Sequence, residues 1–62
     1  MQIIPIDSFI SRHQARLYAV EWQYWVSLKN LSYSELAQWH ELFTELGVMF
    51  DLTDEFKENC II

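Results

Sequence analysis

Residues 17–28 read Leu-Tyr-Ala-Val-Glu-Trp-Gln-Tyr-Trp-Val-Ser-Leu, and this stretch decides the fold because, as a helix, it carries apolar side chains on two faces. At about 100° per residue these side chains fall into two stripes. The aliphatic stripe consists of Ile10, Leu17, Val20, Tyr24 and Leu28. The aromatic stripe consists of Ala15, Tyr18, Trp22, Trp25 and Val26. A surface helix usually carries one apolar stripe, so we expect two different surfaces to cover this helix.

The helix around this stretch is expected to span residues 8–29. Asp7 or Ser8 offers a side-chain oxygen to the free amides of its first turn. Residues 1–6 are expected to form an extended arm, because Pro5 disfavours helix at the residue before it and lacks a backbone donor. The isoleucines of the arm predict that it packs across a helix.

A second helix is predicted over residues 33–46. Ser32 and Glu35 stand three residues apart, as in the reciprocal capping box, and Gly47 is expected to end the helix in a left-handed conformation. Its apolar face consists of Leu36, Trp39, Phe43 and Leu46. The turn before it is short, and short connections usually join antiparallel neighbours. We therefore expect an antiparallel helical hairpin in which this face packs against the aliphatic stripe.

A short third helix is predicted over residues 53–59, with Leu52 and Phe56 facing inward. No linker or repeat divides the 62 residues, so a single small all-α domain, residues 1–62, is expected. A chain this short buries only ~60% of its unfolded surface, and small domains usually add disulfides, a metal or a partner subunit. Cys60 is the only cysteine, so the expected assembly is a homodimeric helical bundle.

The composition argues against catalysis and cofactors. Gly47 is the only glycine, whereas phosphate-binding loops need several. His13, His40 and Cys60 lack the short paired spacing of a metal site, so no metal or cofactor is expected. Neither a signal peptide nor an apolar run of ~18 residues, as a membrane span needs, is visible. We expect a cytoplasmic protein without catalytic residues.

The net charge of −5 is concentrated in the second half of the chain. The predicted acidic surface consists of Glu35, Glu41, Glu45, Asp54, Glu55 and Glu58. A surface of this kind repels phosphate backbones and attracts basic protein surfaces. The alternative is a solvated surface that serves only solubility.

The aromatic stripe supplies the candidate binding site. The second helix of a hairpin hides one stripe of the first, and few residues remain to hide the other. Large aromatic side chains each bury ~150–250 Å², and Trp and Tyr are enriched among interface hot spots. The predicted dimer seam or partner-binding surface therefore consists of Tyr18, Trp22, Trp25 and Val26. The alternative is intrachain core, covered by the arm or by residues 49–62.

These features predict a non-enzymatic protein–protein interaction module, a small acidic regulator or inhibitor that binds itself or a protein with a basic surface. One alternative is an inhibitor of the kind encoded by phages and mobile elements, which mimics nucleic-acid charge to block a DNA- or RNA-binding protein. A second is a nucleic-acid-binding helical hairpin that uses Arg12 and Arg16. Two arginines per chain fall short of the ~6–10 phosphate contacts that such binding often takes, so direct nucleic-acid binding is not expected.

Overall fold

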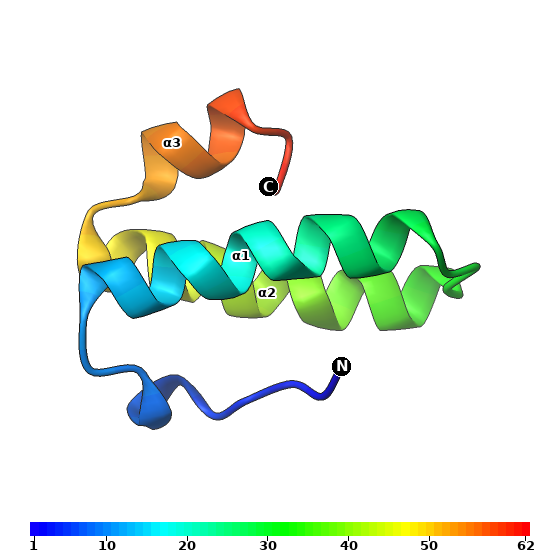
Figure 1. The fold of residues 1–62 in the computed structure, drawn as a ribbon, viewed down its shortest axis with the longest axis horizontal. Coiled ribbons are helices and arrows are strands. Elements are labelled where there is room, and N and C mark those ends of the chain that lie inside the picture. The colour runs from blue at the N-terminus through cyan, green and yellow to red at the C-terminus, as the bar shows by residue number, and fades with distance from the viewer.

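The computed structural model describes all of residues 1–62 and is all-helical, which confirms the fold class. A 3₁₀ turn, η1 (Ile6–Ser8), is followed by α1 (Arg12–Ser27), α2 (Tyr33–Phe50) and α3 (Thr53–Glu58). α1 and α2 lie side by side along the longest axis of the molecule and run in opposite directions (Figure 1).

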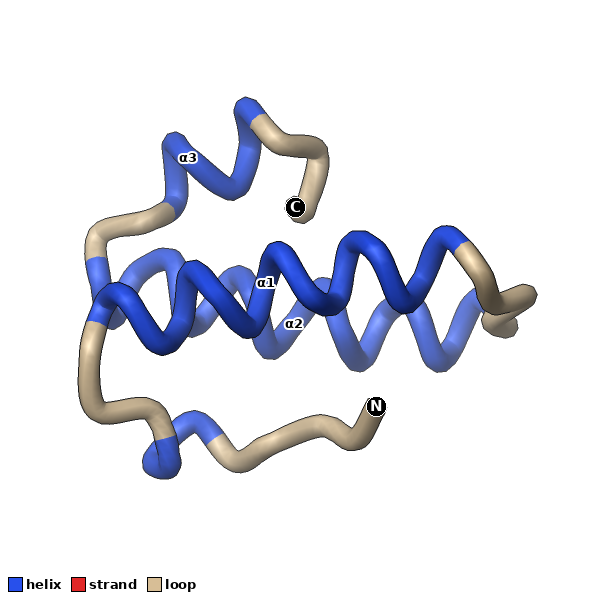
Figure 2. Tube along the Cα trace, in the orientation of Figure 1, coloured by secondary structure: helices blue, strands red, loops and turns tan.

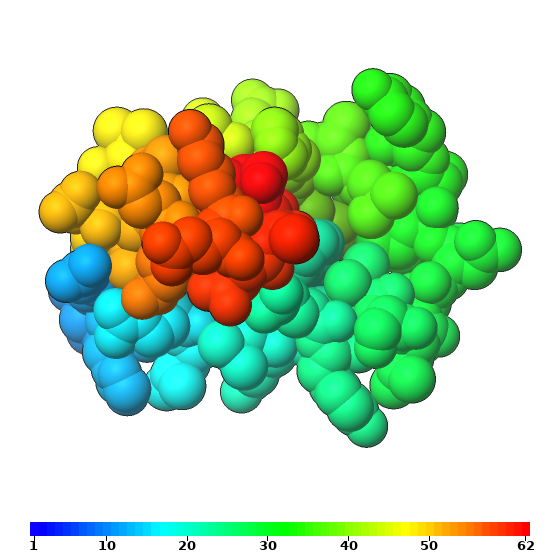
Figure 3. All heavy atoms as spheres, turned by 90° about the horizontal axis from the view of Figure 1, so that it is seen from above, coloured from blue at the N-terminus to red at the C-terminus, as the bar shows by residue number.

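Four segments surround one core. α1 lies in front of α2, with α3 along one side of the pair and the N-terminal arm along the other (Figure 2). Seen from above, α3 lies over the line where α1 and α2 meet (Figure 3). The molecule measures 29 × 24 × 17 Å, and its shortest axis runs from α1 to α2. It is therefore a flat body in which α1 lies toward one broad face and α2 toward the other, with α3 and the arm on either side of them.

α1 begins later than expected. Its N-cap is Ser11, whose hydroxyl accepts a hydrogen bond from the Gln14 amide at 3.1 Å, while the Gln14 side chain accepts one from the Ile10 amide at 2.8 Å. The predicted cap at Asp7 or Ser8 is wrong, because both residues belong to η1 and the chain still has to turn from the arm into the helix. The Ser-x-x-Gln pattern at the true start is a capping-box signature that is visible in the sequence.

α2 begins as predicted. The Ser32 hydroxyl accepts from the Glu35 amide at 3.3 Å, and the Glu35 carboxylate accepts from the Ser32 amide at 3.4 Å, so both halves of the capping box are present. The buried apolar side chains of the helix are Trp39, Leu42, Phe43 and Leu46. Leu36, which was expected on this face, is exposed.

The end of α2 differs from the prediction. Gly47 is a buried residue inside the helix, which continues to Phe50. The left-handed residue is Asp51, with a φ of 57°, and the Leu52 amide donates to the Gly47 carbonyl at 2.8 Å, as in a Schellman motif. A Cβ atom at Gly47 would lie 3.1 Å from the Cα atom of Thr53. The close approach of α3, and not a turn, therefore requires glycine here.

α3 ends in the same way. Cys60 is left-handed, with a φ of 59°, and the Ile61 amide donates to the Phe56 carbonyl at 2.8 Å. This turn brings Ile61 back into the core, where Phe56 is also buried as predicted. α3 and the residues after it therefore close one open side of the α1–α2 pair.

The core is aromatic, and Phe43 of α2 lies against α1 within it. The Phe43 ring centroid is 5.9 Å from that of Tyr18 and 5.0 Å from that of Trp22, and the Trp25 and Trp39 centroids are 5.8 Å apart. The aromatic stripe of α1 therefore packs against α2. The expectation that the aliphatic stripe does so is wrong, because burying the larger aromatic side chains removes more apolar surface from water.

Candidate interaction surfaces

The four side chains predicted to form a dimer seam or partner-binding surface belong to the core of the chain itself. Tyr18 and Trp22 are only 9% and 8% exposed, and Trp25 and Val26 are half-buried against the same core. The Tyr18 hydroxyl donates to the Gln2 carbonyl at 2.5 Å, so the arm covers it, and burial raises the pKa of this hydroxyl. The prediction of an exposed aromatic surface is therefore corrected to the alternative, intrachain core.

The aliphatic stripe is the uncovered face of α1. Ile10, Tyr24 and Leu28 are 87%, 73% and 68% exposed, and Leu17 and Val20 are about half exposed, at 49% and 54%. From Leu17 onward these residues stand three or four positions apart, so they form one row along the helix. A contiguous exposed apolar row of this kind typically marks an interaction site.

The cations near α1 contact other parts of the chain and are not gathered on the aliphatic stripe: Arg12 donates to the Asp51 carbonyl, and the Lys29 Nζ atom lies 6.0 Å from the centre of the Trp25 ring. Arg12 and Arg16 belong to α1 and Lys29 follows it, whereas the only carboxylate on this helix is Glu21. Arg16 forms an ion pair with Glu55 of α3, with Nε and Oε2 2.7 Å apart. The hydrogen bond between them lowers the pKa of Glu55 and raises that of Arg16. α1 therefore presents no acidic surface beside its aliphatic stripe.

The six carboxylates predicted to form one acidic surface belong to three places. Glu35 is part of the α2 cap, and Glu41 and Glu45 lie one turn apart in the middle of α2. The remaining three, all on α3, are Asp54, Glu55 and Glu58. Glu55 alone forms an ion pair within the chain. The negative charge is therefore divided among the α2 cap, the middle of α2 and α3.

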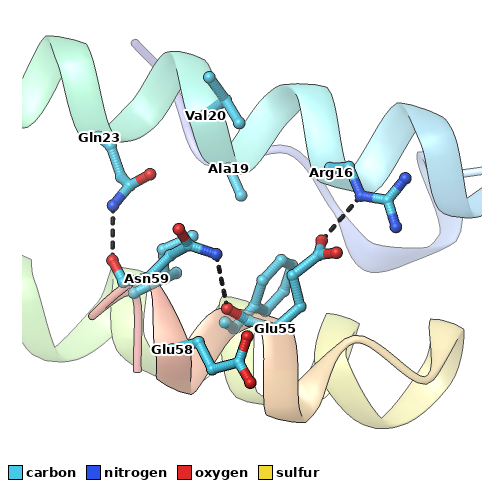
Figure 4. A pocket seen from close by; sticks show the side chains of 9 residues that line it. Arg16, Ala19, Val20, Gln23, Glu55, Glu58 and Asn59 are labelled. Atoms are coloured by element: carbon cyan, nitrogen blue, oxygen red, sulfur yellow. Dashed lines mark hydrogen bonds and ion pairs between the residues drawn. The ribbon is translucent and has the colours of Figure 1, made fainter.

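A pocket of about 290 Å³ lies between α1 and α3 (Figure 4). Two polar bridges cross it: the ion pair between Arg16 and Glu55, and a hydrogen bond from the Gln23 side chain to the Asn59 carbonyl at 2.6 Å. The Asn59 side chain also donates to the Glu55 carbonyl at 2.8 Å. Because these polar groups bind one another, the interactions across the pocket hold α3 against α1.

A second concave surface follows α2 on the side of the arm, and we call it the arm groove. It has two adjoining parts, of about 270 and 490 Å³, which share Ile6 and Glu45. The first part lies between the arm and α2, and the second reaches Val48 and Met49 near the end of α2. The sequence prediction missed this surface because it ended the second helix at residue 46, whereas Val48 and Met49 belong to the last turn of α2.

No three side chains among His, Cys, Asp and Glu lie where they hold a metal ion together. His13, His40 and Cys60 are all exposed and lie on different elements. Each of the helices is too short or too polar to cross a membrane. What the structure presents to its surroundings is a set of surfaces.

Comparison with protein-family models, with curated proteins and with solved structures gives no match for this chain. The function of the chain is therefore inferred from the aliphatic stripe and the arm groove.

Proposed function

We propose that this chain is a non-enzymatic protein-interaction module, a small acidic regulator that assembles with a second copy of itself through the aliphatic stripe of α1. The observation that carries the proposal is the exposure of five large apolar side chains in one row on a broad face of the molecule. Covering such a row removes apolar surface from water, which is favourable by roughly 25 cal/mol per Å².

The small size of the chain favours a partner subunit. A chain of 62 residues has a small core of its own, and a partner subunit is one of the usual ways in which such domains gain stability.

The charge distribution favours the same arrangement. Two copies that each carry a net charge of −5 repel one another. α1 carries a single carboxylate, Glu21, whereas α2 and α3 carry three each, so two copies bring the fewest carboxylates together when their α1 faces meet.

The row is self-complementary about a two-fold axis. In such an interface, residue i of one copy contacts residue j of the other and the reverse contact is also made. With the two α1 helices antiparallel, the Leu17 end of one copy lies against the Leu28 end of the other, and Val20 and Tyr24 meet near the axis. Ile10, Leu17, Val20 and Tyr24 fall on a and d positions of a heptad pattern, as in a coiled-coil seam.

The two nucleic-acid alternatives have less support. Arg16 is engaged by Glu55, and the Arg12 side chain donates to the Asp51 carbonyl at 3.2 Å. The carboxylates that would imitate phosphates are divided between α2 and α3.

The mass of the protein in solution tests the proposal. Sedimentation equilibrium of the full chain is expected to give about twice the chain mass. Leu17→Glu combined with Tyr24→Glu places like charges in the seam and is expected to give a monomer, which folds because both side chains are exposed.

Circular dichroism checks that this double variant keeps its helices. Val48→Glu, the same kind of change at an exposed position of α2, is the matched control and is expected to leave the dimer intact. A wild-type chain that stays monomeric at about 100 µM, where even a weak dimer of similar Kd is substantially formed, contradicts the proposal.

A further inference from the structure

The arm groove combines exposed apolar side chains with unpaired negative charge. Ile3 and Met49 are about half exposed and Val48 is 75% exposed, so the groove has an apolar floor in contact with water. Glu41 and Glu45 lie along it, one helical turn apart on α2. Neither carboxylate forms an ion pair within the chain, and no cation lines the groove.

The dimensions of the groove suit a short helix. The lining residues of α2 extend from Gln38 to Met49, a rise of about 16 Å at ~1.5 Å per residue. A helix of about three turns has this length and presents apolar anchors at every third or fourth position. Such anchors reach the apolar floor from one side of the partner helix, while the flanking positions face the carboxylates.

We propose that the arm groove binds a cationic amphipathic helix of another protein. The apolar face of that helix covers Ile6, Val48 and Met49, and its Lys or Arg side chains pair with Glu41 and Glu45. Opposite charges of this kind steer association and fix the register of the bound helix. The inference does not rest on the α1 dimer, because the groove and the aliphatic stripe belong to different elements and different faces.

The occupant is not a second copy of this chain, again for reasons of charge. Another copy brings a net charge of −5 to a surface that is already acidic. Of its four cationic side chains, Arg16 is already paired with Glu55 and Arg12 donates to the Asp51 carbonyl. A foreign segment rich in Lys and Arg has neither disadvantage.

Fluorescence anisotropy with a synthetic probe tests the inference. The probe is a fluorescein-labelled peptide of about 14 residues, built from leucine and lysine at helical spacing, and its control is the same peptide with glutamate in place of lysine. The full-length chain is expected to bind the lysine peptide saturably and at least about tenfold more tightly than the glutamate peptide. The affinity is expected to fall as NaCl rises from about 50 to about 500 mM, because salt screens the charges.

Variants locate the binding site. Glu41→Gln with Glu45→Gln removes the two charges without changing shape and is expected to weaken binding about tenfold, the size of effect that a loss of roughly 1.4 kcal/mol produces. Its matched control is Glu21→Gln with Glu58→Gln, which removes two exposed charges elsewhere and is expected to change binding by less than about twofold. Val48→Ser is expected to weaken binding several-fold, whereas Val20→Ser on α1 is not.

Three results overturn the inference: no saturable binding, equal weakening by both pairs of glutamate variants, or a groove variant that changes the chain's mass in solution while no peptide binds. The last result identifies a second copy as the occupant. The α1 double variant Leu17→Glu with Tyr24→Glu separates this inference from the proposed dimer, since it is expected to be monomeric and still to bind the lysine peptide.

Discussion

Gly47 lies inside a regular helix, where glycine is normally unfavourable by about 1 kcal/mol relative to alanine. Its backbone faces the start of α3, and a Cβ atom there would lie 2.9 Å from the Thr53 Oγ1 atom and 3.1 Å from its Cα atom. Four residues later, Asp51 adopts the left-handed conformation that favours glycine. The only glycine of the chain is therefore used for close packing, and the turn is made by a residue with a side chain.

Two substitutions at this end of α2 are expected to act in opposite directions. Gly47→Ala is expected to destabilise the fold by about 1–2 kcal/mol, because overpacking against the Thr53 backbone exceeds the gain in helix propensity. Asp51→Gly is expected to stabilise it by about 0.5 kcal/mol by relieving the left-handed conformation. Thermal unfolding measures both changes, and Asp54→Gly, at an exposed helical position of α3, is the control that should destabilise. A higher melting temperature for Gly47→Ala would show that α3 moves away without cost.

At the scale of elements, α3 is the part of the molecule that depends most on its contacts. Its six residues are too few to hold a helix in isolation. Phe56 and Ile61 anchor it in the core, and the ion pair between Arg16 and Glu55 fastens its outer side to α1. α1 and α2 are longer, carry side-chain caps and pack against one another through the aromatic core.

The attachment of α3 is expected to weaken in acid. The pKa of Glu55 is lowered in the folded chain, chiefly by its hydrogen bond with Arg16, from an ordinary value of 4.5. A carboxylate with a lowered pKa stabilises the fold above its unfolded pKa, and that contribution is lost as the pH falls through the folded value. Melting temperatures of the wild type and of Glu55→Gln should therefore differ at pH 7 and converge as the pH falls below 4.5 and through the lowered pKa of Glu55.

The control for this pH experiment is Glu58→Gln. Glu58 lies three residues after Glu55 on the same helix and forms no ion pair. Its difference from the wild type is expected to stay nearly constant over the same pH range. A gap between the wild type and Glu55→Gln that persists in acid strong enough to protonate Glu55 would show that Glu55 acts through packing and not through its charge.

At the scale of the whole molecule, the two broad faces differ in character. The α1 face is apolar, whereas the α2 side carries Glu41 and Glu45 beside the arm groove. A molecule built in this way can assemble through one face and leave the other free for a partner. The proposed dimer and the proposed partner of the groove are thus compatible with one another.

Assembly through α1 is expected to couple folding to protein concentration. Because only the folded chain dimerises, the melting temperature of the wild type should rise by about 5 °C per tenfold increase in concentration. The double variant Leu17→Glu with Tyr24→Glu should melt at a temperature that does not depend on concentration. Scanning calorimetry over a hundredfold range of concentration measures both, and a wild-type melting temperature independent of concentration would count against the dimer.

Much of the fold follows from local signals in the sequence. The capping box at Ser32 and Glu35 predicts the start of α2, and the scarcity of glycine and proline predicts the all-helical class. The two-striped character of α1 also follows from periodicity alone. The Ser-x-x-Gln pattern at Ser11 is an equally local signal for the start of α1, and the predicted cap at Asp7 or Ser8 missed it.

The tertiary structure decided which of the two stripes is buried. Periodicity shows which side chains share a face of α1, but it carries no information about which face another helix will cover. Tyr18, Trp22 and Trp25 have more surface to remove from water than the aliphatic side chains do, and the rings of Trp39 and Phe43 on α2 match them. The sequence alone therefore shows that α1 needs two surfaces to cover its two apolar stripes. The packing of the aromatic rings determined that the first is α2 and left Leu17, Val20 and Tyr24 facing water.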